Sequence, residues 1–156
     1  MNRRLTHIAG LAAVALLLAT APACNDTDDP GQAEAVILVT SISTSGLSVA
    51  SGTDTVADIG YTLNARSEGS NTFYHDITLT SYTVEFAPAV VAPMSGLIPT
   101  AFCPAGGSCA VSLVLVPNGS KPGAGTTVVA TIEVDGKDIN DNPVNFTATA
   151  PLTFTP

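Results

Sequence analysis

Apolar and polar residues alternate along much of the chain from Val36 onward, which is the pattern of β-strands that bury one face. The alternation is clearest near the end, where Val144, Phe146 and every second residue after them are apolar. No stretch after Ala35 has an apolar stripe at helical spacing, so the pattern predicts an all-β domain. Strands are predicted at 36–42, 57–65, 111–116, 128–134 and 144–154.

A further strand, predicted at 77–86, changes phase along its length. Its apolar side chains alternate as far as Leu79 and resume one step out of phase at Tyr82. One extra residue near Thr80 and Ser81 would return both halves to the same face, which is the effect of a β-bulge. The sequence therefore predicts a bulge in the middle of this strand.

Short turn-forming runs separate neighbouring strands at 117–120 and 134–137. Pro151 has no N–H for a sheet hydrogen bond, so the last strand is expected at an exposed edge. Five to eight short strands of this kind predict an antiparallel β-sandwich. In strand count and spacing, residues 36–156 resemble the immunoglobulin-like and fibronectin-III-like domains of bacterial surface proteins. The resemblance implies an immunoglobulin-like β-sandwich and carries no functional motif.

The segment 87–102 fits neither a free loop nor a central strand, because it is strongly apolar and contains three prolines. It can form a short edge strand that covers the core, or it can display apolar side chains to a partner, with Met94 and Leu97 as candidate contacts. Phe73 and Tyr74 form a second candidate contact, since aromatic residues are enriched at interfaces. For the segment 87–102, the edge strand and the display to a partner both stay open.

The N-terminus is predicted to be a secretory signal peptide that spans residues 1–23. Arg3 and Arg4 precede an uncharged run of twelve residues at 8–19, and small residues follow it. The apolar run is too short to span a hydrocarbon core of ~30 Å, and the order of positive, apolar and small segments is that of an export signal. We therefore expect the chain to leave the cytoplasm.

The residues around Ala23 and Cys24 resemble the lipobox of bacterial lipoproteins, in which a small residue precedes the cysteine that is acylated. The resemblance implies lipidation of Cys24 and a membrane-anchored protein of the bacterial cell envelope, periplasmic or surface-exposed. Ala21 stands where the family usually has leucine, and 21–23 also fits an ordinary cleavage site, which leaves a soluble secreted protein as the alternative.

Residues 24–35 are expected to be the lipidated cysteine and an acidic linker, and 36–156 the folded domain. The chain has thirteen acidic and five basic residues, and two of the basic ones precede the cleavage site. Nucleic-acid binding is excluded, because it depends on lysine and arginine to neutralise phosphates.

Cys103 and Cys109 are expected to form a disulfide, because turn-forming residues separate them and an exported protein meets an oxidising compartment. Three cysteines are present, so acylation of Cys24 would consume the odd one. A redox-active pair normally has C-x-x-C spacing, and a zinc site would lack ligands because His75 is the only histidine after the signal peptide.

Asp135, Asp138 and Asp141 crowd one turn together with two asparagines. Calcium prefers six to eight hard oxygen ligands, so a structural calcium site is one interpretation of this segment. The spacing is not that of an EF-hand, and the same residue types are common in solvated turns, so the expected cofactor set is none or a structural calcium ion.

No nucleophile elbow, phosphate loop or cofactor motif is present, so the chain is not expected to be an enzyme. The favoured interpretation is a non-enzymatic, lipid-anchored interaction or structural module whose partners are the membrane, through its anchor, and another envelope protein. The alternative is a carbohydrate-binding or calcium-stabilised adhesion domain, or an accessory of an envelope enzyme. The chain has no tryptophan and three tyrosines, which gives little material for a sugar-binding platform.

Overall fold

The computed structural model describes residues 35–65, 76–104 and 106–156. Within them the chain forms seven strands and one short 3₁₀ turn, η2 (Asn118–Ser120). No helix of this part of the chain is long and apolar enough to cross a membrane. The strands are β1 (Ala35–Ser45), β2 (Thr55–Ala65), β3 (Ile77–Ala87), β4 (Met94–Cys103), β5 (Ser108–Val116), β6 (Thr127–Asp138) and β7 (Pro143–Thr153).

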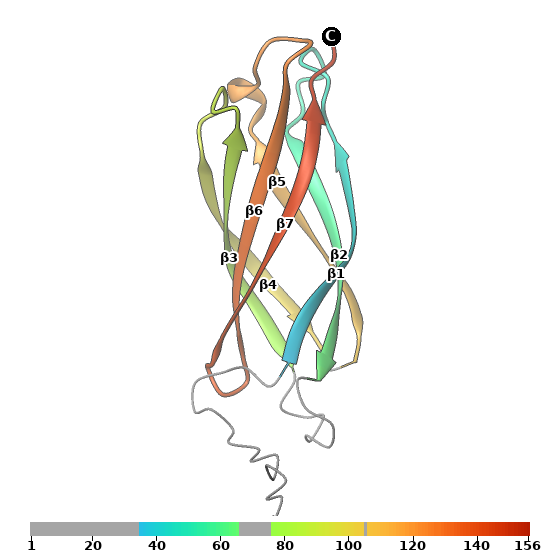
Figure 1. Ribbon diagram of the computed structural model, residues 1–156, viewed down its shortest axis with the longest axis vertical. Helices are drawn as coiled ribbons and strands as arrows, with labels where there is room; N and C mark the ends of the chain where they lie inside the picture. The colour runs from blue at the N-terminus through green and yellow to red at the C-terminus, as the bar shows by residue number, and fades with distance from the viewer. Residues whose placement is uncertain (1–34, 66–75, 105) are drawn as a thin grey trace, which may run out of the picture.

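The strands form two antiparallel sheets, ordered β1-β2-β5 and β4-β3-β6-β7, which confirms the predicted sandwich (Figure 1). The fourth strand pairs with the third, whereas in constant-type immunoglobulin domains it joins the sheet of the first two strands. β7 is an edge strand, as Pro151 predicted.

The core lies between the two sheets and is built from the inward half of each alternating strand. In β7, every second residue from Val144 to Leu152 is buried and each residue between is exposed. β6 behaves in the same way from Val128 to Val134. Each such residue removes an apolar side chain from water, which stabilises the fold by about 1.5–3 kcal/mol for a valine, leucine or phenylalanine.

The predicted bulge in β3 is confirmed, because the register with both neighbours shifts between Leu79 and Ser81. In the pairing with β6, Thr80 is the extra residue. In the pairing with β4 both strands are irregular, since the three residues from Leu79 to Ser81 lie opposite the five from Leu97 to Ala101. The regular pairing of β3 with β4 is therefore interrupted at this point.

The predicted turn at 134–137 is wrong, because β6 continues through this segment to Asp138 and the chain reverses at 139–142. Gly136 is a strand residue that pairs with Leu79 and Val144. A Cβ atom at Gly136 would lie 2.7 Å from the carbonyl oxygen of Thr78, so glycine permits close approach of β3 to β6.

The two ends of the sandwich differ in what they carry. β1 begins at the lower end in Figure 1, where β4 joins β5 and β6 turns into β7. The C-terminus lies at the upper end. There the chain after β1 crosses to the other sheet, because Val49 N–H donates to Thr155 O (2.9 Å) and Thr155 N–H donates to Leu47 O (3.1 Å).

Candidate functional site

The disulfide joins the two sheets at one side of the sandwich. Cys103 ends β4 and Cys109 lies near the start of β5, and their Cα atoms are 5.9 Å apart. β4 and β5 are edge strands of different sheets, so the bond fixes one sheet to the other as well as closing a short loop. The expected pairing of Cys103 with Cys109 is confirmed.

Tyr82 forms a second link between the same two edges. Its hydroxyl donates to the carbonyl oxygen of Val114 in β5 (3.0 Å), and its ring crosses β4 at Gly96. A Cβ atom on Gly96 would lie 2.5 Å from that ring, so glycine is needed for the ring to pass. Burial raises the pKa of Tyr82 above its usual value.

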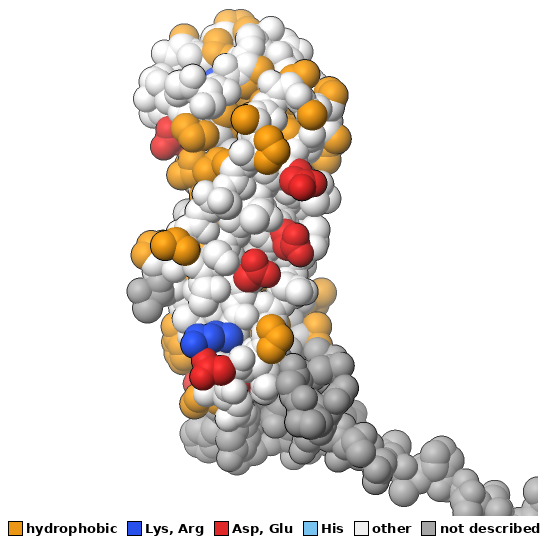
Figure 2. Space-filling model, turned by 90° about the vertical axis from the view of Figure 1, so that its left-hand side faces the viewer, with side chains coloured by type: hydrophobic (Ala, Val, Ile, Leu, Met, Phe, Trp, Pro, Cys, Tyr) orange, Lys and Arg blue, Asp and Glu red, His pale blue; other side chains and the backbone are white. Residues whose placement is uncertain are grey.

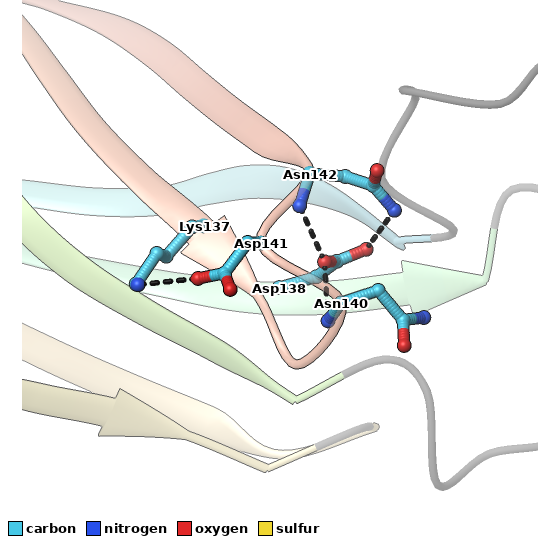
Figure 3. A network of polar contacts seen from close by, with 5 residues as sticks. All are labelled: Lys137, Asp138, Asn140, Asp141 and Asn142. Carbon is cyan, nitrogen blue, oxygen red and sulfur yellow. Dashed lines mark hydrogen bonds and ion pairs between the residues drawn. The ribbon is translucent and has the colours of Figure 1, made fainter.

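Asp138 organises the turn between β6 and β7 (Figure 3). This buried carboxylate accepts the backbone N–H of Asn140 and of Asn142, each at 2.8 Å, and the side-chain amide of Asn142 at 3.0 Å. The backbone N–H of Asp138 also donates to Asn142 O (3.0 Å). Three donors therefore satisfy a carboxylate that would otherwise be costly to bury.

The carboxylates of the other two acidic residues of the candidate calcium site do not take part in this hydrogen-bond network. Asp141 forms an exposed ion pair with Lys137 and has a positive φ of 63°, while Asp135 is exposed further along β6. Across the described ranges, no group of three or more histidine, cysteine, aspartate or glutamate side chains is arranged to hold a metal ion. The calcium site stays a prediction, and the carboxylates of Asp138 and Asp141 are engaged in these contacts.

The segment 87–102 contains the expected edge strand, and the display of its apolar side chains to a partner stays a prediction. Val91 and Ile98 are buried, so β4 is an edge strand that covers the core. Met94 is half-buried against the core, whereas Leu97 is 84% exposed. The candidate contacts Phe73 and Tyr74, and the candidate lipidation site Cys24, lie outside the described residues.

Phe102 is an exposed aromatic side chain that the sequence pattern did not single out. It is 57% exposed and pairs with Thr78. Its position just before the buried Cys103 was the available signal, because neighbouring residues of a strand point to opposite faces. A hollow beside β4 is lined by Thr78, Leu79, Thr80, Leu97, Ile98 and Pro99.

Lys121 fixes the loops at the upper end of the sandwich. Its ammonium group donates to the carbonyl oxygens of Gly46 and Ser48, each at 2.7 Å. In the same loops, the carboxylate of Asp54 accepts a hydrogen bond from the backbone N–H of Asn118 (2.8 Å). The sequence held no signal for this contact, since Lys121 lies 75 residues from Gly46.

Among the buried side chains of the described residues, Tyr61 is the one whose polar atom is left without a hydrogen-bond partner. Its side chain is 1% exposed, its ring lies 5.8 Å from that of Phe146, and no donor or acceptor among the described residues contacts its hydroxyl. Burial raises the pKa of Tyr61. The ring fills the core between the two sheets.

No protein-family model and no curated protein matches this chain. Among solved structures, the X-ray structure of Northeast Structural Genomics Consortium target SoR45 is similar, with 10% sequence identity and a TM-score of 0.47. The similarity covers 79% of this chain and 88% of that one. A likeness at this level carries no argument about function.

Proposed function

We propose that this protein is a lipid-anchored component of the bacterial cell envelope whose β-sandwich acts as a non-enzymatic interaction or structural module. The observation that supports this most is the position of the two ends of the described chain at opposite ends of the sandwich. β1 starts at one end of the sandwich, and the C-terminus with the loops that Lys121 fixes lies at the other (Figure 1). An anchor at Cys24 would therefore hold the sandwich by one end and leave its sides free for a partner.

The rigidity of the sandwich supports the same proposal. The disulfide and Tyr82 join the sheets along one side, and the contacts of Val49 with Thr155 join them at the upper end of the other. A module that presents a surface to a partner loses less conformational entropy on binding when its backbone is already fixed.

The alternative of a sugar-binding domain has less support from the aromatic residues. Tyr61 is 1% exposed and Tyr82 is 6% exposed, so neither ring can stack on a sugar. Within the described ranges, Phe102 is the aromatic side chain that remains exposed.

Replacement of Cys24 by serine tests the proposal. We expect Cys24→Ser to move the protein from the detergent phase to the aqueous phase of a phase-partition assay, because two acyl chains are needed for stable anchoring. Its thermal unfolding should not change, since Cys24 precedes the sandwich. Cys103→Ser is the matched control and should stay in the detergent phase. Wild-type protein in the aqueous phase would contradict the proposed anchor.

A further inference from the structure

The outer face of the four-stranded sheet has an apolar rim along β4. We use this name for Leu97, Pro99 and Phe102, all of which are exposed. Leu97 is 84% exposed and Phe102 is 57% exposed, and both line up with outward-facing residues of β3, namely Ser81 and Thr78. Exposed large apolar residues that stand together are typical of surfaces that bind a partner.

The bulge between β3 and β4 produces this rim. Five residues of β4 from Leu97 to Ala101 lie opposite three residues of β3, and within this irregular stretch Leu97 and Pro99 are exposed on either side of the buried Ile98. The hollow beside the rim lies at this irregular stretch and is lined by residues of both strands, including Leu79 and Thr80. Bulges of this kind commonly re-aim side chains next to functional sites.

Acidic side chains lie next to the rim on the same face. Leu97 pairs with Ser81, and Ser81 pairs with Asp135, so these residues form one row across three strands. Glu133 is two residues away on β6, and Glu85 is its diagonal neighbour on β3. Glu133 is therefore about 7 Å from Asp135 along the strand and about 7 Å from Glu85 across the strands, so the three carboxylates repel one another. Figure 2 shows acidic side chains following one another down this side of the molecule.

The charges decide which occupant fits. A second copy of the chain has no free basic group to offer among its described residues, because Lys121 binds loop carbonyls and Lys137 pairs with Asp141. A face-to-face dimer would place acidic groups opposite each other. The acidic segment 25–34 and an anionic lipid surface would also be repelled. A basic partner would relieve the repulsion among the three carboxylates.

We propose that the outer face of β4, β3 and β6 docks a basic segment of another protein. An apolar side chain of that segment enters the hollow beside Leu97, and its lysine or arginine side chains pair with Glu85, Glu133 and Asp135. This inference rests on the proposed interaction role and is independent of the lipid anchor.

A defined peptide tests this surface. The mature protein, labelled with ¹⁵N in zwitterionic detergent micelles, is titrated with an acetylated peptide of alternating lysine and valine. One control peptide has glutamate in place of lysine, and another has serine in place of valine. We expect the lysine–valine peptide to shift the amide signals of Ser81, Leu97 and Asp135, and added salt to weaken its binding. Neither control peptide should shift them.

Variants separate the two parts of the surface. Glu133→Gln combined with Asp135→Asn should weaken binding about fivefold, because each exposed charge pair contributes modestly. Leu97→Ser should abolish the shifts at β4 without a change in melting temperature. Asp58→Asn and Leu38→Ser, at exposed positions of the other sheet, are the matched controls and should bind like the wild type.

Three results would overturn the inference: equal binding of the glutamate peptide, shifts confined to other parts of the protein, or self-association through Leu97. Binding of a neutral glycan at this face would also overturn it, in favour of the sugar-binding alternative. None of these results bears on phase partitioning, so the lipid anchor stands or falls separately.

Discussion

At the scale of single residues, the two buried tyrosines illustrate opposite uses of a hydroxyl group. Tyr82 donates to Val114 O and links the two sheets, whereas the hydroxyl of Tyr61 has no partner within the described ranges. A buried polar group without a partner costs about 1–3 kcal/mol, while a satisfied one contributes about 1 kcal/mol. Replacement by phenylalanine should therefore lower stability at Tyr82 and not at Tyr61.

We expect Tyr61→Phe to raise the free energy of unfolding by up to about 1 kcal/mol or to leave it unchanged, because the ring is kept and only the unpaired hydroxyl is lost. Tyr82→Phe should lower it by about 1 kcal/mol, since the carbonyl of Val114 loses its donor. Urea denaturation followed by circular dichroism measures both. A clear loss of stability in Tyr61→Phe would show that its hydroxyl has a partner.

Asp138 and Asp141 make a second contrast, within one turn. Asp138→Ala removes the acceptor for three donors and should destabilise the fold by about 2–3 kcal/mol. Asp141→Asn removes an exposed ion pair, keeps a residue type that tolerates positive φ, and should change stability by less than about 0.5 kcal/mol. Equal effects of the two substitutions would contradict this assignment.

The same turn decides the calcium prediction. The carboxylate of Asp138 already accepts hydrogen bonds from backbone and side-chain donors, so we expect millimolar Ca²⁺ to leave the melting temperature of metal-stripped protein unchanged. A ligand that binds the native state alone would raise it. A rise that Asp138→Asn and Asp141→Asn abolish would establish the calcium site instead.

At the scale of strands, the sequence predicts well wherever alternation is unbroken. β6 and β7 follow the pattern from residue to residue, and the phase change near Thr80 correctly located the bulge. The prediction from sequence fails where a glycine is needed for two strands to pack closely. Gly136 reads as a turn residue, yet it lies in β6 because a side chain would meet the backbone of β3. Such contacts between distant segments leave no local signal.

β4 was hard to predict for the same reason. Gly96 interrupts its apolar pattern because the ring of Tyr82 needs the space, and Pro99 is tolerated because β4 is an edge strand. The edge-strand interpretation is confirmed, because Ile98 covers the core; Leu97 is exposed to solvent, and its contact with a partner stays a prediction. The rim and its acidic neighbours could be found only once the register of three strands was known.

The disulfide gives a prediction about β4 and β5. On the chain-entropy model, closing a seven-residue loop stabilises a fold by about 2.4 kcal/mol. We expect the double variant Cys103→Ser, Cys109→Ser to lose about this amount and to unfold at the same urea concentration with and without reductant. Wild-type protein should lose stability only when reduced. Equal stability of reduced and oxidised wild type would contradict a structural role for the bond.

At the scale of the whole molecule, export and anchoring were predicted from residues 1–24, and the architecture from everything after Val36. The structure adds the direction in which the parts are arranged: the chain enters the sandwich at one end, ends at the other, and has its apolar rim on a side. Sequence alone could not give this direction, because it depends on how the two sheets pair. An anchored module with a free side face is the account that unites these features.

The mass of the mature N-terminus tests that account most directly. Protein extracted from native membranes is digested, and its N-terminal peptide is analysed by mass spectrometry. The account predicts a peptide that begins at Cys24 and carries acyl chains, with Cys103 and Cys109 joined elsewhere in the digest. A peptide that begins at an unmodified Cys24, or at any other residue, would contradict the lipid anchor on which the proposed role depends.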